Sequence, residues 1–160
     1  MAKRIGRHTL LLTCSPSVIG YAAVGARKEK QGPLADYFDL LSEDSSFGEK
    51  TWEQAETLMQ KKAVELALQK SSLKKDDIDF LFAGDLLNQC ISSAYASREM
   101  QIPFFGLYGA CSTMSESLSL ASLFQLSVQP LFALYFLLEY FLYLAQSFFL
   151  QAVPPFLLMK

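Results

Sequence analysis

The chain has 160 residues and a net charge of −2 at pH 7, and 51% of its residues are hydrophobic. This length suits one domain around one core, and the near-neutral charge excludes a general affinity for nucleic acid. Cys14, Cys90 and Cys111 are odd in number and share the chain with a single histidine, His8. The sequence therefore predicts reduced thiols, as in a cytoplasmic protein, with no disulfide framework, no metal site and no cofactor.

The N-terminal part of the chain predicts two short strands and a loop. The apolar run at residues 10–12 is shorter than the core of an export signal, so residues 9–13 are predicted to form a first strand. Residues 18–24 are apolar enough for a second strand. Residues 25–48 are polar and lack a period, which predicts a long surface loop with a short helical piece at residues 34–41.

Residues 51–70 show the clearest helical pattern in the chain. Thr51 is a suitable N-cap, acidic residues follow in the first turns, and basic residues follow later. The charged side chains, Glu56 among them, are predicted to form the solvated face of this helix. The apolar stripe expected to face the core consists of Trp52, Ala55, Met59, Ala63, Leu66 and Ala67.

The next segment alternates between strand and helix patterns. Residues 78–83 predict a buried strand, 86–100 a helix, and 102–108 another strand that ends before a second helix. This alternation indicates an α/β fold with a parallel sheet covered by helices. Ligands gather at the carboxyl ends of strands in such sheets. Asp85 and Cys111 follow two such ends, so we expect them to face one crevice, with Asn88 as a further ligand-binding candidate.

Cys111 lies in a distinctive setting, because the pair Gly109 and Ala110 precedes it and a run of small and apolar residues follows. A cysteine at the first turn of a helix is favoured as a thiolate by the unpaired backbone N–H groups and by the helix dipole. A small buried thiol with no chemistry is the other interpretation of this pattern. The residues around Cys111 leave both open.

Three long runs resemble one known family. Residues 32–39 (GPLADYFD), 74–89 (KKDDIDFLFAGDLLNQ) and 102–122 (IPFFGLYGACSTMSESLSLAS) are similar to the stage V sporulation protein AD family, which is thiolase-like. The resemblance covers about residues 1–122 and implies a partial thiolase-like fold, the first part of one βαβαβ half. It places Cys111 at the position of the cysteine that accepts an acyl group in thiolases and ketosynthases.

The resemblance also implies a function. Proteins of this family are tied to dipicolinic acid in the spore, and the expected role is binding the ligand for uptake or retention together with the other stage V sporulation A-operon proteins. The expected location is the cytoplasm or the periphery of the spore inner membrane, and homodimers are expected of the full-length family. An acyltransferase using Cys111 is the alternative, but no histidine follows Cys111 and His8 precedes the first strand.

The end of the chain follows a different pattern. Residues 1–116 hold 28 of the 30 charged side chains, and residues 117–160 hold only Glu139 and Lys160. We interpret residues 1–122 as the thiolase-like segment and 123–160 as an apolar, helical tail without family resemblance, added where the reading frame departs from the family. A second alternative is a small membrane-anchored protein, because residues 131–153 are long enough to cross a bilayer.

Overall fold

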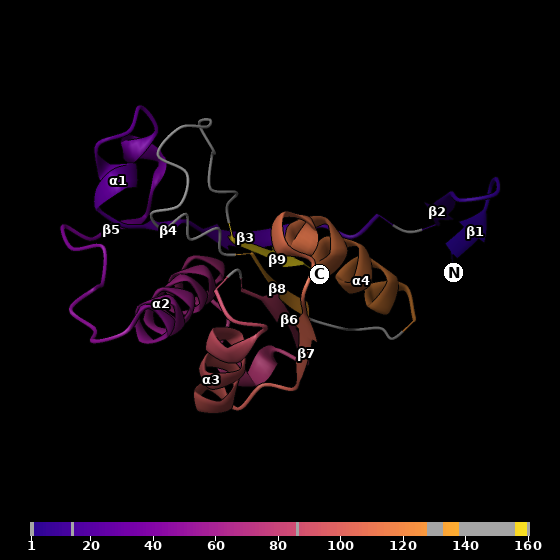
Figure 1. Ribbon diagram of the computed structural model, residues 1–160. Helices are drawn as coiled ribbons and strands as arrows, with labels where there is room; N and C mark the ends of the chain where they lie inside the picture. The colour runs from indigo at the N-terminus through magenta and orange to yellow at the C-terminus, as the bar shows by residue number, and fades with distance from the viewer. Residues whose placement is uncertain (1, 14, 86, 128–132, 138–155, 160) are drawn as a thin grey trace.

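A computed structural model describes residues 2–13, 15–85, 87–127, 133–137 and 156–159 (Figure 1). Its central sheet has the strand order β3-β9-β8-β6-β7. The pairs β6·β7 and β6·β8 are parallel, whereas β9 runs antiparallel to both β8 and β3. The predicted α/β class is confirmed, with a mixed sheet. The strands are β3 (Val18–Ala22), β6 (Phe80–Gly84), β7 (Phe104–Leu107), β8 (Ala133–Leu137) and β9 (Phe156–Met159).

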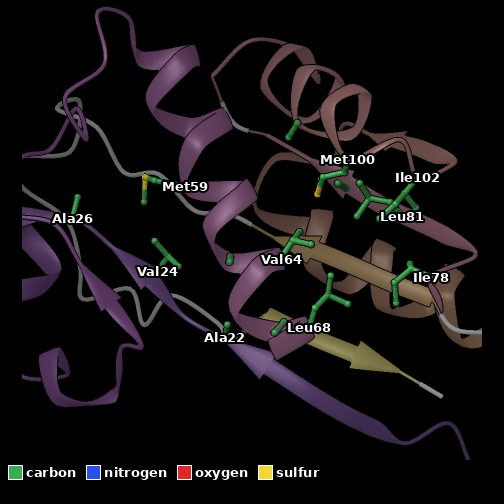
Figure 2. Close-up of a cluster of buried hydrophobic side chains, with 14 residues drawn as sticks. Ala22, Val24, Ala26, Met59, Val64, Leu68, Ile78, Leu81, Met100 and Ile102 are labelled. Atoms are coloured by element: carbon green, nitrogen blue, oxygen red, sulfur yellow. The ribbon is translucent and has the colours of Figure 1, made fainter. Parts of the chain in front are cut away.

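Strand β6 forms the centre of the core because both of its faces are covered. Leu81 and Ala83 join a cluster with residues of helices α2 (Trp52–Ser71) and α3 (Ile91–Met100). Figure 2 shows Val64 and Leu68 of α2 lying over this part of the sheet. Phe82, on the other face of the strand, packs against residues of helix α4 (Thr113–Ser127). The predicted buried strand is thus confirmed, with helices on both sides of it.

Aromatic rings link α4 to the sheet. The rings of Phe82 and Phe105 lie opposite each other on neighbouring strands and stack with centroids 5.1 Å apart. Phe124 of α4 meets Phe82 edge to face at 5.1 Å and Phe105 at 5.2 Å. Such pairs each add about 0.5–1.5 kcal/mol beyond the apolar area that they bury. Phe124 lies beyond residue 122, so the helix that follows Cys111 continues into the start of the predicted tail.

Helix α2 confirms the predicted helix and most of its predicted core stripe, because Ala55, Met59, Ala63 and Ala67 are buried. The buried face is wider than predicted and includes Glu56, Gln60, Val64 and Leu68. Thr51 caps it, since its Oγ1 accepts a hydrogen bond from Gln54 N at 3.3 Å. Trp52, predicted to be buried, is 44% exposed, and Glu56, predicted to be solvated, is fully buried. The reason is that α3 packs along this side of α2, where Gln60 Nε2 donates to Ser93 Oγ at 3.1 Å.

Helix α3 begins later than its pattern predicted, at Ile91 rather than near residue 86. Gln89 and Cys90 adopt left-handed backbone conformations, with φ of 49° and 69°, and these conformations exclude a continuous helix. Leu86 lies outside the described residues. The turn that results brings the start of α3 back towards the carboxyl end of β6.

The N-terminal part contains more elements than predicted. The first predicted strand appears as β2 (Leu10–Leu12), paired with β1 (Ala2–Arg4) in a hairpin of its own. The second divides into β3 and β4 (Val24–Gly25), which belong to different sheets. The predicted loop contains α1 (Arg27–Lys30), the short helix η1 (Ala35–Tyr37) and β5 (Leu40–Leu41), which pairs with β4 in parallel.

The predicted helical tail is wrong for its described part beyond Ser127. Residues 133–137 and 156–159 form strands β8 and β9, both inside the central sheet. Of the predicted membrane span at 131–153, residues 133–137 form a strand that pairs with β6, and the other residues of the span lie outside the described part. None of the described helices is long and apolar enough to cross a membrane.

Candidate functional site

The candidate site lies where β6 and β7 end. The two strands are parallel and in register, with Gly84 opposite Leu107, so their carboxyl ends lie at one edge of the sheet. Asp85 follows the first end, and the turn with Cys111 follows the second. The predicted placement of both residues at neighbouring strand ends agrees with this topology.

Asp85 is a helix cap. Its side chain is enclosed, with 1% of the residue exposed. Oδ1 accepts a hydrogen bond from Cys90 N at 2.5 Å, and Oδ2 accepts one from Ser93 N at 3.1 Å. These N–H groups belong to the unpaired donors at the start of α3, where a carboxylate is also favoured by the helix dipole. Both oxygens are thus directed at the protein backbone, which leaves Asp85 poorly placed to bind a ligand.

Asn88 lies in the turn ahead of α3 and is exposed. Its backbone carbonyl accepts a hydrogen bond from Ile91 N at 3.1 Å, which helps to fix the turn. The structure therefore places Asn88 beside the strand ends, at the surface, whereas Asp85 is buried beneath the same turn. The role of Asn88 in ligand binding stays a prediction.

Cys111 is exposed, in the short helix η3 (Ala110–Ser112) directly ahead of α4. The turn is held by Gly109: its carbonyl accepts hydrogen bonds from Ser112 N at 3.0 Å and from Ser112 Oγ at 2.7 Å. Gly109 N donates to Thr113 Oγ1 at 3.2 Å. The predicted order of strand, tight turn and helix is confirmed, and it presents the Cys111 thiol at the surface, which excludes the interpretation as a buried thiol.

Gly109 lies close to two side chains of the following helical turns, which a larger residue would displace. A Cβ atom there would lie 2.5 Å from Ser112 Oγ and 2.8 Å from Glu116 Oε2. The chain thus turns tightly against the first turn of α4, and Glu116 reaches back over the turn. The strand end therefore carries a carboxylate that the sequence interpretation did not consider, although an acid five residues after the cysteine, on the first turn of a helix, is a readable signal.

Cys90 connects the two strand ends and was not predicted as a site residue. Its Sγ donates to Leu107 O at 2.9 Å, while its N–H is held by Asp85. Partial burial raises the pKa of the Cys90 thiol, and the charges of Asp85 and Glu116 raise it further. Cys90 therefore stays protonated near neutral pH, which suits a structural hydrogen-bond donor and disfavours a nucleophile.

The charge of this region is negative. Asp85 and Glu116 both act on Cys90, and Arg98, the sole basic residue between Lys75 and Lys160, is exposed towards the end of α3. Seven residues of helix, or about 10 Å, separate Arg98 from the start of α3. Within the described residues no group of three or more histidine, cysteine or acidic side chains is arranged to hold a metal ion.

A surface cavity of about 500 Å³ lies elsewhere, between α2 and α3. Glu49, Glu53 and Glu99 contribute carboxylates to its lining, and the one lysine there, Lys61, is paired with Glu99. The predicted site residues do not line this cavity. Its acidic lining disfavours an anionic ligand.

The described part of the chain is thus an α/β protein that presents an exposed cysteine between the end of strand β7 and the start of helix α4. The sequence model of stage V sporulation protein AD (SpoVAD) matches residues 6–134, and the chain belongs to this family of sporulation proteins. It is 42% identical over 120 residues to stage V sporulation protein AD of Bacillus subtilis (strain 168), which covers 75% of the chain and 36% of that relative. The chain thus spans little more than a third of the relative.

The family match includes residues 123–134, which the sequence interpretation assigned to the tail. In the structure these residues comprise the last turns of α4 and the start of β8. The boundary at residue 122 stays a prediction. The match supports the resemblance read from residues 32–39, 74–89 and 102–122, all of which lie within it.

Proposed function

We propose that this chain is the N-terminal part of a spore protein that binds dipicolinic acid for uptake or retention and does not turn it over. The observation that carries the proposal is the family match over residues 6–134 with 42% identity to a stage V sporulation protein AD. The proposed partners are dipicolinic acid and the other stage V sporulation A-operon proteins, and the proposed location is the cytoplasm or the periphery of the spore inner membrane.

The residues at the strand ends argue against acyl transfer by this chain. A cysteine nucleophile needs a base or a strongly lowered pKa, and the common base is histidine. His8, the one histidine in the sequence, lies in the turn of the β1–β2 hairpin, which is set apart from β6 and β7 (Figure 1). Cys111 thus lacks its usual catalytic companion within this chain.

The described residues at the strand ends lack the cationic groups that a complete dipicolinate site would need. Dipicolinate carries two carboxylates, which favour cationic side chains and free backbone N–H groups. Here Asp85 and Glu116 make the strand ends acidic, and the N–H groups at the start of α3 that Asp85 caps are already occupied. The cations of a complete pocket would come from the part of the longer protein that this chain does not span.

Titration calorimetry with dipicolinate tests this proposal on two proteins, this chain and the full-length Bacillus subtilis relative. We expect the relative to bind and this chain to show no heat of binding. Failure of the relative to bind would remove dipicolinate as the ligand. Binding by this chain at the affinity of the relative would show that its site is complete. It would overturn our further proposal that the chain alone is a truncated, non-functional fragment.

A homodimer, as the resemblance implies for the full-length family, is a further proposal. Strand β7 ends the strand order of the central sheet within the described residues. Its sequence, Phe104–Leu107, carries no charge, and Phe105 is exposed. An uncharged edge strand is a surface on which a second chain can pair.

A further inference from the structure

We propose that the β1–β2 hairpin docks the protein on an anionic lipid surface. The hairpin, residues 2–12, lies beyond α4 at one end of the molecule (Figure 1). Its two strands form a separate sheet and are almost entirely exposed. An isolated two-stranded hairpin is at best marginally stable in water, so a surface that receives it would stabilise it.

The hairpin exposes large aliphatic side chains on both faces. Ile5, Leu10 and Leu11 are 54%, 53% and 50% exposed. In the register of the strands, Leu10 lies opposite Arg4, whereas Leu11 lies opposite Lys3. Opposite residues share a face of the ribbon, and consecutive residues alternate between faces. A flat protein surface covers one face only, whereas lipid headgroups can contact both faces of a ribbon that lies among them, and their polar atoms and water satisfy its open edges.

The charge of the hairpin identifies the kind of lipid. Lys3, Arg4 and Arg7 are its ionised residues, and the first acidic residue of the chain is Glu29. The remainder of the chain holds 16 acidic and 11 basic side chains. An anionic surface therefore attracts the hairpin and repels the body, which orients the molecule with the hairpin towards the lipid.

The structure separates the cations that bind lipid from the one that shapes the hairpin. Arg4 closes the turn, because its Nε donates to Gly6 O at 2.9 Å and its Nη2 donates to Arg7 O at 2.7 Å. Lys3 and Arg7 take no part in these hydrogen bonds through their side chains. Replacing both by glutamine thus removes charge and retains the contacts of Arg4 that hold the turn.

Vesicle flotation tests the proposal, with phosphatidylcholine alone and with phosphatidylcholine mixed with phosphatidylglycerol. We expect the whole chain to bind the mixed vesicles and to lose binding as salt is added. The double variant Lys3→Gln with Arg7→Gln should bind about 25-fold more weakly, since each cation near an anionic surface contributes about fivefold. The matched control, Lys50→Gln with Lys75→Gln, removes the same charge from two exposed lysines of the body and should bind nearly as well as the parent, because these lysines lie outside the hairpin.

Three results would overturn the inference. The first is equal binding to both kinds of vesicle, which would indicate the apolar tail as the anchor. The second is undiminished binding of the Lys3→Gln, Arg7→Gln variant. The third is an absence of vesicle binding together with self-association, measured by sedimentation, that this variant abolishes; a second copy would then be the occupant. The outcome is independent of dipicolinate binding, so the inference and the proposed function can fail separately.

Discussion

Replacing Gly84 by alanine is expected to destabilise the fold by about 3 kcal/mol, near the upper end of the usual cost of overpacking a core. A Cβ atom at this position would lie 2.2 Å from Leu107 O and 2.8 Å from Thr113 Cγ2. The first contact is with the backbone of the paired strand, so no side-chain rotation relieves it. Strands β6 and β7 would have to move apart at the end where Asp85, Cys90 and the Cys111 turn meet.

Urea unfolding followed by circular dichroism measures this effect as a lower midpoint at an unchanged slope. Gly6→Ala is the matched control, because a Cβ atom at Gly6 has a nearest neighbour 4.0 Å away, Thr9 Oγ1. We expect that control to stay within about 0.5 kcal/mol of the parent protein. Equal stability of the two variants would show that β6 and β7 are not packed as described at their carboxyl ends.

Replacing Asp85 by alanine is expected to destabilise the protein by about 3 kcal/mol, because it leaves the N–H groups of Cys90 and Ser93 buried without their acceptors. Asp85→Asn retains the shape and one acceptor oxygen, but its amide N–H₂ faces the other N–H group. We expect that variant to lose about 2 kcal/mol.

The same unfolding experiment compares these variants with Asp36→Asn, which changes an exposed acid and should alter the stability by less than about 0.5 kcal/mol. We expect the free energy of unfolding to be lowest for Asp85→Ala, intermediate for Asp85→Asn and highest for Asp36→Asn. If Asp85→Asn were as stable as the parent and instead weakened dipicolinate binding by the full-length relative at the matching residue, Asp85 would be a ligand-binding residue and not a cap.

The sequence predicted the strand-turn-helix at Cys111 because local signals agree there. An apolar run, a small pair and a helical pattern follow one another, and each has one natural interpretation. The buried strand β6 was equally readable, because its residues are apolar on both faces. The α/β class followed from the alternation of such segments.

Other features depended on contacts between distant parts of the chain. Glu56 carries a charge that local pattern places in water, yet it is fully buried. It lies one turn before Gln60, which donates to Ser93 of α3, and α3 begins after the left-handed turn at Gln89 and Cys90. The strands β8 and β9 were missed for another reason. Their residues are apolar throughout, so the sequence has no alternation that distinguishes a strand from a buried helix. They form strands because they pair with β6 and with each other in the central sheet.

The site was predicted in part. Cys111 and Asp85 follow neighbouring strand ends as expected, but the sequence does not show that the oxygens of Asp85 point at N–H groups of α3. Cys90 was recognised as a thiol without a role. Its bond to Leu107 O joins residues 17 apart in sequence, and such a contact appears only when the two strands are in register.

We propose that the Cys111 turn belongs to a protein that binds a ligand and forms no acyl-enzyme. Intact-protein mass spectrometry after incubation with acetyl-coenzyme A distinguishes the two roles, on this chain and on the full-length Bacillus subtilis relative. We expect unmodified masses for both proteins. A stoichiometric acetyl adduct on a cysteine, released by hydroxylamine as a thioester, would contradict it and establish acyl transfer.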